Sequence, residues 1–365
     1  MTVGVGVGLL VAVGSQAPVA AAPADGHYWV EQLRLPQAWQ AATGAGVTVG
    51  VLDTGVNADH PDLAGVVLPG RAFPDLGDGT RDGQGHGTTV AMLIAGQGHQ
   101  GATRGVAPRV KIRPAVAAGG AATVDQAMRW LVDQRVSVVN VSLGRGASSP
   151  AYDAALRYAA DHDVVVVAAA GNAGQDSAVV SPADRPGVLA VSAVDRDGAF
   201  RPEVSVSGPA VALAAPGVDI VTAAESPVAG RSLSGNGTSY AAAIVTGVVA
   251  LVRSRFPRMD AANVVQRVVT TARRPAGAGA GRDSRYGFGV VDPVAALTVA
   301  VPTVAANPLG TLPPGPGDPD RGRGRSPGGV RAVLPGVLLG LALAGTAAAL
   351  GAARVVRSRR GGRRS

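Results

Sequence analysis

The sequence contains no cysteine, so neither a disulfide bond nor a cysteine-ligated metal can form anywhere in its 365 residues. Aromatic residues make up only 3% of the chain, and Lys111 is its single lysine. Alanine, valine and glycine are abundant instead, and such small side chains suit strands and helices that pack closely together. The length allows one large domain with appended segments.

Acidic and basic residues are balanced along most of the chain, and the net charge of +8 comes from its end. Ten arginines and two aspartates follow residue 300, so the preceding residues carry equal numbers of both signs. A domain that binds nucleic acid through its surface charge would show a basic excess of its own. The sequence therefore gives no support for nucleic acid as a partner of the main domain.

Four short segments supply, in order, the groups needed for attack on a peptide carbonyl. They are VLDTG at 51–55, GHGT at 85–88, AAAGN at 168–172 and GTSYAA at 237–242. The first two contribute a carboxylate, Asp53, and an imidazole, His86. The last two contribute an amide, Asn172, and a hydroxyl, Ser239. Each segment lies beside a predicted strand or helix end.

These four groups have complementary chemistry. Ser239 is the candidate nucleophile, although a serine hydroxyl attacks poorly at neutral pH unless a base removes its proton. His86 is the candidate base because imidazole titrates close to neutral pH. Asp53 would hold the imidazole in the required tautomer and stabilise the imidazolium. Asn172 would donate its amide to the developing oxyanion, with the backbone N–H of Ser239 as second donor.

Each of these residues also has an ordinary structural interpretation when it is considered alone. Asp53 could be a strand-end turn residue, or part of the Asp-Thr-Gly triplet of aspartic proteases, which requires a second such motif or a dimer. His86 and Asn172 could occupy turns, and Ser239 could be a helix N-cap. The joint occurrence of all four in this order favours the serine protease interpretation.

With its motifs in the order Asp, His, Ser, the chain resembles the subtilisin-like serine proteases, or subtilases. The resemblance extends from about residue 46 to residue 297. It includes HPDL at 60–63, GVAP at 105–108 and GFGVVDP at 287–293. Within the family, the chain is most similar to the mycosins, the membrane-anchored subtilases of actinobacterial type VII secretion systems.

The resemblance also implies roles for individual residues. It implies a catalytic triad of Asp53, His86 and Ser239 with Asn172 as the oxyanion donor, and no cofactor. Two further segments are expected to bind substrate: Ser142, Leu143 and Gly144 would pair with the substrate backbone, and Ala169, Ala170 and Gly171 would form the opposite wall of the first specificity pocket. Pairing through backbone groups gives affinity with little choice of sequence.

Apolar β-branched runs alternate with helical runs from residue 47 onward, which predicts an α/β fold. Strands are expected at 47–52, 136–141, 164–169, 188–194 and 211–214. Helices are expected at 86–95, 122–134, 152–161, 240–256 and 260–272. This alternation indicates a mainly parallel sheet with helices on both faces, as in a subtilisin-like domain.

Apolar segments at both ends of the chain predict export and membrane attachment. Residues 3–13 are apolar and are followed by small residues, as in a secretory signal peptide, with a buried strand as the alternative. Residues 332–353 carry no charge. As a helix they would span about 33 Å, enough to cross a bilayer core, with a buried core helix as the alternative. The arginines that follow predict a cytoplasmic tail, which places the catalytic domain outside the cell.

The chain is thereby divided into six segments. We expect a signal peptide at 1–22, an N-terminal extension at 23–44 with a short helix from Leu35 to Ala42, a subtilisin-like catalytic domain at 45–300, a Pro/Gly/Arg-rich linker at 301–331, one C-terminal transmembrane helix at 332–353, and a basic cytoplasmic tail at 354–365. This organisation predicts a single-pass protein of the cell membrane.

Five aspartates crowd the region between Asp53 and His86, at positions 59, 62, 75, 78 and 82. No loop there shows a recognisable calcium pattern, so we expect solvated loop acids and no metal site. His60 in the HPDL segment is expected to be structural.

The sequence leads to two hypotheses about function. The first is a membrane-anchored serine endopeptidase that acts on peptide or protein substrates and is associated with membrane components of a type VII secretion system. The alternative is a scaffold of such a secretion complex, in which proteolysis is secondary.

Overall fold

The computed structural model describes residues 27–315, except 75–76, 100–103, 118–120, 145–148, 223–232, 276–277 and 279–280. The predicted signal peptide at 1–22 and transmembrane helix at 332–353 lie outside the described residues. Within the described part of the chain, no helix is both long enough and apolar enough to cross a membrane.

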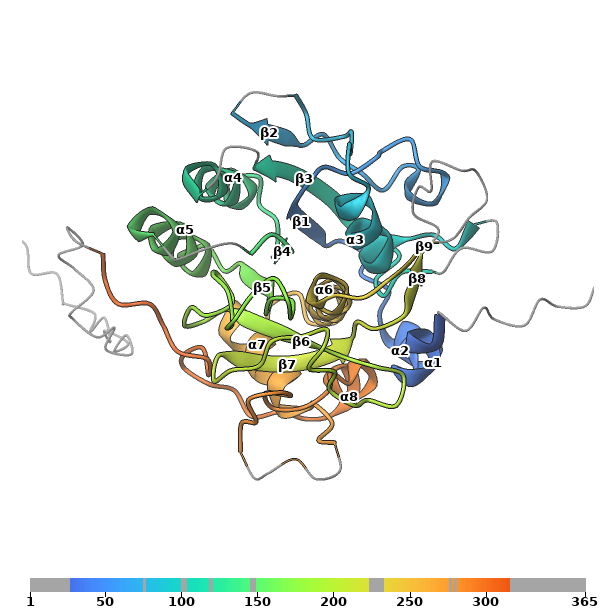
Figure 1. Ribbon diagram of the computed structural model, residues 1–365, viewed down its shortest axis with the longest axis vertical. Helices are drawn as coiled ribbons and strands as arrows, with labels where there is room; N and C mark the ends of the chain where they lie inside the picture. Colours follow the sequence, from blue (N-terminus) through green and yellow to red (C-terminus); the bar gives the residue numbers. More distant parts are fainter. Residues whose placement is uncertain are drawn as a thin grey trace, which may run out of the picture. The chain divides into compact units, whose positions relative to one another are not determined.

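A seven-stranded sheet forms the centre of the domain, in the order β2-β3-β1-β4-β5-β6-β7 (Figure 1). The strands are β1 (Thr48–Asp53), β2 (Arg71–Phe73), β3 (Lys111–Ala117), β4 (Val138–Val141), β5 (Val165–Ala169), β6 (Leu189–Val194) and β7 (Val211–Pro216). Every neighbouring pair is parallel. A separate antiparallel pair joins β8 (Ile220–Thr222) and β9 (Leu233–Gly235). The expected α/β architecture with a parallel sheet is confirmed.

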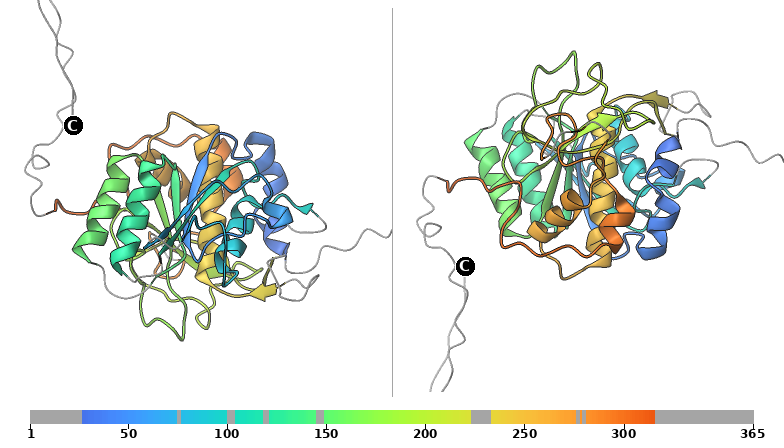
Figure 2. Two further views of the ribbon diagram at one scale, coloured as in Figure 1. Left: turned by 90° about the horizontal axis from the view of Figure 1, so that it is seen from above. Right: turned by 90° about the horizontal axis from the view of Figure 1, so that it is seen from below.

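Helices cover both faces of the sheet, as Figure 2 shows edge-on. On one face lie α4 (Ala121–Asp133) and α5 (Pro150–Asp161), and on the other lie α3 (His86–Ala95) and α6 (Thr238–Arg255). The remaining helices are α1 (Tyr28–Gln32), α2 (Leu35–Ala41), α7 (Ala261–Thr270) and α8 (Pro293–Thr298), with one 3-10 turn at Pro61–Leu63. Strands β4 to β7 are buried on both faces, which explains their near-continuous valine and alanine runs.

Strand β3 was not predicted, and its sequence shows why. The segment KIRPAVA mixes charged residues with a proline, which argues against a central strand. The N–H of Ile112 points to the side of β3 on which β2 lies, where it donates to the carbonyl of Val66. Every second backbone nitrogen of a strand points to the same side, so the nitrogen of Pro114 also points toward β2. Strand β2 pairs only with residues 115–117, so Pro114 lies beyond the end of that ladder and interrupts no pairing.

The described part of the predicted linker, residues 301–315, lies along the catalytic domain without regular secondary structure. Val304 N–H donates to Asn263 Oδ1, and Asn307 Nδ2 donates to the carbonyl of Gly187. Further along, Arg157 donates to the carbonyl of Pro313. This part of the segment is therefore held to the domain by hydrogen bonds, and any free linker begins after it.

Candidate active site

The candidate catalytic residues meet at the carboxyl ends of the central strands. Asp53 is the last residue of β1, Asn172 follows β5, and Ser142 follows β4. The order of strands reverses beside β1, because later strands are added on either side of it. Ligands of open parallel sheets bind at the carboxyl ends beside such a reversal. His86 and Ser239 lie in the first turns of α3 and α6, the two helices that share one face of the sheet.

Asp53, His86 and Ser239 form one continuous chain of hydrogen bonds. The Nδ1 atom of His86 lies 2.7 Å from Asp53 Oδ1, and its Nε2 atom lies 3.0 Å from Ser239 Oγ. Asp53 is 1% exposed, whereas the His86 side chain is 31% exposed and accessible from the solvent side. This arrangement lets a proton pass from Ser239 to His86 while Asp53 fixes the ring.

Glycines allow the two elements of the acid–base pair to approach each other. A Cβ atom at Gly87 would lie 2.1 Å from the carbonyl oxygen of Gly55 and 3.0 Å from Cβ of Asp53. Gly55 itself has φ of +116°, which side chains rarely adopt, and a Cβ there would meet the carbonyl of Arg81. Gly87 is thus required by close packing of α3 on the end of β1, and Gly55 by its backbone conformation and the loop at Arg81.

Asp82 organises the start of α3 and was not recognised from the sequence. Its Oδ2 accepts from the N–H and hydroxyl of Thr88, and its Oδ1 accepts from the hydroxyl of Thr54 and the N–H groups of Gln84 and Gly85. These bonds hold the pKa of Asp82 below its ordinary value although burial opposes them. Asp82 is therefore an ionised group whose charge acts on His86. Its position in the turn that leads into GHGT was the available signal.

The pKa of His86 is set by opposing influences. Burial favours the neutral ring and works to lower the pKa. The hydrogen bond to Asp53 and the negative charges of Asp53 and Asp82 outweigh burial and raise the pKa of His86 above its ordinary value. Imidazolium is therefore stabilised, as a base that must hold a proton during the reaction requires.

Asn172 is oriented by Thr238, the residue that precedes Ser239. Its Oδ1 atom accepts from both the backbone N–H and the hydroxyl of Thr238, each at 3.0 Å. With the oxygen fixed in this way, the Nδ2 atom is left without a partner among the described residues and can donate to a ligand. Ser239 is the second residue of α6, where the backbone N–H has no acceptor within the helix. These two donors match the predicted oxyanion site.

The predicted substrate-binding residues occupy two segments that flank Ser239. Ser142 Oγ lies 3.4 Å from the carbonyl oxygen of Ser239, Leu143 packs partly against the core, and Gly144 closely approaches Val180. Ala169 is 6% exposed and Ala170 is fully buried. Ala170 and Gly171 also use their backbone N–H and C=O groups within the protein. The 169–171 segment can therefore support a pocket wall, whereas the backbone groups of Ala170 and Gly171 are not free to pair with a peptide.

Tyr240, the residue after Ser239, was also not recognised from the sequence. The ring of Tyr240 stacks beside that of His86, with ring centres 6.2 Å apart and planes inclined by 28°. A Cβ atom on Gly235 would lie 2.6 Å from the Tyr240 hydroxyl, so strand β9 packs directly on this ring. Tyr240 thus links His86 to the small β8–β9 sheet.

Two of the crowded aspartates are not the solvated acids that the sequence suggested. Asp62 is 2% exposed, and its Oδ1 accepts from the N–H of His99 at 2.7 Å. Asp82 is hydrogen-bonded as described above. His60 is structural, because its Nδ1 accepts from the N–H of Asp62 at the 3-10 turn. Within the described ranges, no group of three or more His, Asp or Glu side chains could hold a metal ion.

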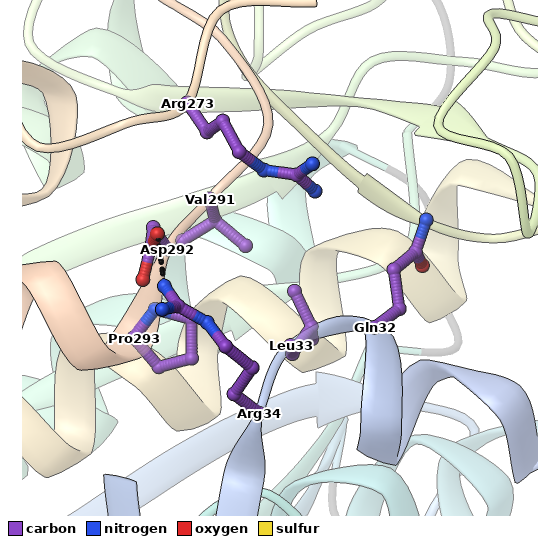
Figure 3. A pocket seen from close by; sticks show the side chains of 7 residues that line it. All are labelled: Gln32, Leu33, Arg34, Arg273, Val291, Asp292 and Pro293. Atoms are coloured by element: carbon purple, nitrogen blue, oxygen red, sulfur yellow. Dashed lines mark hydrogen bonds and ion pairs between the residues drawn. The ribbon is translucent and has the colours of Figure 1, made fainter. Parts of the chain in front are cut away.

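A pocket of about 330 Å³ lies elsewhere, between the N-terminal extension and residues near α8 (Figure 3). Arg34, in a left-handed backbone conformation, forms an ion pair with Asp292 on one side of it. Arg273 extends into the pocket from the opposite wall. None of the four candidate catalytic residues lines this pocket, which lies where the N-terminal extension packs against the domain.

The chain is similar to known serine proteases over most of the described domain. The profile of the Subtilase family, Peptidase S8, matches residues 44–289. Mycosin-3 of Mycobacterium tuberculosis is 36% identical, over 74% of this chain and 71% of that protein. A thermostable alkaline protease of Halalkalibacterium halodurans is also 36% identical, over 68% of this chain and 66% of that protein.

Solved structures show the same relationship. The structure of the MycP3 protease from the type VII (ESX-3) secretion system aligns with a TM-score of 0.66 and 35% identity, covering 77% of this chain and 90% of that one. A chain in the periplasmic assembly from the ESX-5 inner membrane complex aligns with a TM-score of 0.66 and 32% identity, covering 79% and 87%.

Proposed function

Because this chain belongs to the subtilase family of serine proteases, we propose that it hydrolyses peptide bonds through an acyl-enzyme formed on Ser239. The observation that carries the proposal is the hydrogen-bonded chain from Asp53 through His86 to Ser239, at 2.7 and 3.0 Å. A nucleophile, a base and an orienting acid at these distances are what acyl transfer needs.

The proposed reaction has two halves, formation of the acyl-enzyme and its hydrolysis, and the same groups act in both. His86 Nε2 removes the proton of Ser239 Oγ as Oγ bonds to the scissile carbonyl carbon. The carbonyl oxygen becomes negative and accepts hydrogen bonds from Asn172 Nδ2 and the Ser239 N–H. The C–N bond then breaks, and His86 gives its proton to the leaving amine. Water, activated by His86, releases the acid and restores the Ser239 hydroxyl.

Labelling with a fluorophosphonate probe tests the assignment of the nucleophile. We expect the full-length protein in membranes to be labelled, and Ser239→Ala to abolish labelling. Ser254→Ala is the matched control, since Ser254 lies on the same helix and its hydroxyl donates to the carbonyl of Ala45. Labelling that survives Ser239→Ala would reject the proposed nucleophile.

We further propose that the enzyme is anchored in the cell membrane by residues 332–353, with its catalytic domain outside and its arginine-rich tail in the cytoplasm. Support comes from the uncharged 22-residue stretch and the arginines after it. Its substrates would be extended segments of secreted or envelope proteins. The relationship to mycosins favours association with membrane components of a type VII secretion system.

The absence of cysteine makes this topology easy to test. A cysteine placed at Ser358 should be protected from an impermeant thiol reagent in intact cells, whereas one at Ser326 should react. Truncation at about residue 325 should release a soluble, active enzyme. Reaction at position 358, or a truncated protein that remains in the membrane, would contradict the proposed orientation.

A scaffold role is the second candidate, because one aligned chain belongs to the ESX-5 inner membrane assembly. The two roles are separated by comparing a deletion strain complemented with wild type or with Ser239→Ala. Secretion restored by both proteins would indicate a scaffold, whereas secretion restored by wild type alone would indicate that proteolysis is required.

A further inference from the structure

Strand β4 carries a polar side chain where its neighbours are all valine. Asn140 is 0% exposed, as are Val138 and Val139, and Val141 is 1% exposed. Its backbone is paired on both sides, with β1 and with β5, so the amide lies in the middle of the sheet. Burial of an amide is costly unless its polar atoms are hydrogen-bonded. The question is therefore what this asparagine bonds to.

Both ends of the Asn140 amide are occupied, and its partners lead to the active site. Its Oδ1 accepts from the hydroxyl of Thr246 at 2.9 Å, and its Nδ2 donates to Ser142 Oγ at 2.8 Å. Ser142 Oγ in turn donates to the carbonyl oxygen of Ser239 at 3.4 Å. Thr246 is also 0% exposed. Four groups thus form a chain that runs from the interior of α6 to the backbone of the nucleophile.

We propose that Thr246, Asn140 and Ser142 are positioning residues, which fix the nucleophile helix relative to the segment expected to bind substrate. The inference rests on the proposed function of Ser239. None of the three contributes a reacting atom. Their contribution is to hold Ser239 and the start of the 142–144 segment at a constant separation, which governs how closely a bound peptide approaches Oγ.

The spacing of residues along α6 supports this role. Thr246 follows Ser239 by seven residues, which is about two helical turns, so both lie on the same face of the helix. That face of α6 contacts β4, where the hydrogen bonds continue from Thr246 to Asn140 and from Asn140 to Ser142. The helix is therefore attached at two points roughly 10 Å apart along its axis, to Asn140 in β4 and to Ser142 directly after it. Two attachments prevent sliding and rotation that one would allow.

Thr246 also sets the direction of the chain. Because its hydroxyl donates to Asn140 Oδ1, the Asn140 nitrogen faces Ser142, and Ser142 keeps its own proton for the carbonyl of Ser239. If the amide were turned over, Ser142 would donate to Asn140 instead, and the link to Ser239 would be lost. Thr246→Val should therefore weaken a contact that Thr246 itself does not touch.

The test compares two isosteric changes in the full-length enzyme. Thr246→Val removes the hydroxyl that begins the chain, and Thr271→Val is the control, since the Thr271 hydroxyl donates only within its helix region, to the carbonyl of Arg267. We expect Thr246→Val to lower kcat on a fluorogenic peptide by about five- to tenfold, the effect of one hydrogen bond, with KM little changed. Thr246→Ser should restore kcat because it keeps the donor.

A double-mutant cycle distinguishes a chain from a loss of stability. Thr246 and Ser142 are linked only through Asn140 in these contacts, so Ser142→Ala in a Thr246→Val background should cause little further loss if they act together. Rates are referred to active sites counted with a fluorophosphonate, so unfolded protein does not contribute. Equal kcat for Thr246→Val and Thr271→Val, no recovery in Thr246→Ser, or losses that simply multiply would each overturn the proposal. Failure of Ser239 labelling in wild type would instead reject the proposed function.

Discussion

The two sides of the Ser239 hydroxyl are built from different kinds of group. On the acid–base side, Asp53, Asp82 and His86 form a charged network, and the pKa of His86 is raised by it. On the other side, the side-chain amide of Asn172 is held by a neutral hydroxyl and a backbone N–H from Thr238, while the carboxylate of Asp176 accepts only from the Asn172 backbone N–H. The difference follows the reaction, since a proton moves on one side and a negative charge develops on the other.

This contrast has a physical consequence for how the two sides respond to change. A charged network stabilises one protonation state, so its effect depends on pH. A neutral network offers fixed dipoles that are already oriented before the charge appears, so its effect is the same at any pH at which the protein is folded. Substitutions on the two sides should accordingly differ in pH dependence as well as in size.

The largest effect is expected from Asp53→Asn, on the charged side. An amide at this position cannot stabilise imidazolium and favours the wrong tautomer of His86. We expect kcat to fall by about 10⁴-fold, as in other triads, with the fold retained. Asp133→Asn is the control, an exposed aspartate that accepts from the hydroxyl of Tyr158. Activity close to wild type in Asp53→Asn would show that this carboxylate does not serve His86.

On the neutral side, Asn172→Ala should lower kcat by about 10²- to 10³-fold, the loss that removal of one oxyanion donor causes in subtilisin. The loss should appear in kcat more than in KM, because the amide meets charge that exists mainly in the transition state. Asn307→Ala serves as the control, because it removes an amide of the 301–315 segment that donates to the carbonyl of Gly187. A change confined to KM would exclude Asn172 as an oxyanion donor.

A smaller effect on the same side is expected from Thr238→Val. The substitution removes the hydroxyl that accompanies the backbone N–H in holding Asn172 Oδ1, so the amide becomes less well oriented, and it also removes the acceptor of the Gly171 N–H. We expect kcat to fall by about tenfold, the value of one hydrogen bond, at all pH values where wild type is active. Thr238→Ser should recover most of the loss. An effect that varied with pH would contradict the neutral character of this side.

The four residues that the sequence singled out do lie together in the structure, and they could be recognised because each lies in a motif whose neighbours are constrained. Gly87 must be glycine for α3 to reach the end of β1, Gly55 must be glycine for its backbone conformation and the nearby Arg81 carbonyl, and these requirements make GHGT and VLDTG recognisable. The central strands were predicted because burial on both faces imposes valine and alanine runs.

Residues that act through the reacting groups could not be predicted in the same way. Thr246 and Asn140 are 106 positions apart, and each alone is an ordinary helix or strand residue. Asp82 is one of several aspartates in a loop, and only the fold shows that five hydrogen bonds converge on it. Strand β3 was missed because Pro114 is tolerated only where β2 ends. For Thr246 and for β3 the decisive contact is between segments distant in sequence, whereas four of the five bonds to Asp82 come from residues within six positions of it.

The smallest effect on the reaction should come from Asp82→Asn, which keeps the size of the side chain but removes a charge that acts on His86, along with the acceptor of the two bonds from Thr88. That charge helps to raise the pKa of His86, so its loss should lower the pKa. Only neutral His86 can accept the proton of Ser239, and the acid limb of the kcat/KM profile should therefore move to lower pH. Asp78→Asn is the matched control, an exposed aspartate in the same loop whose Oδ1 accepts from Thr80. An acid limb that stays in place in Asp82→Asn, or that moves equally in Asp78→Asn, would mean that the charged network ends at Asp53, and that the two sides of Ser239 differ by a single carboxylate.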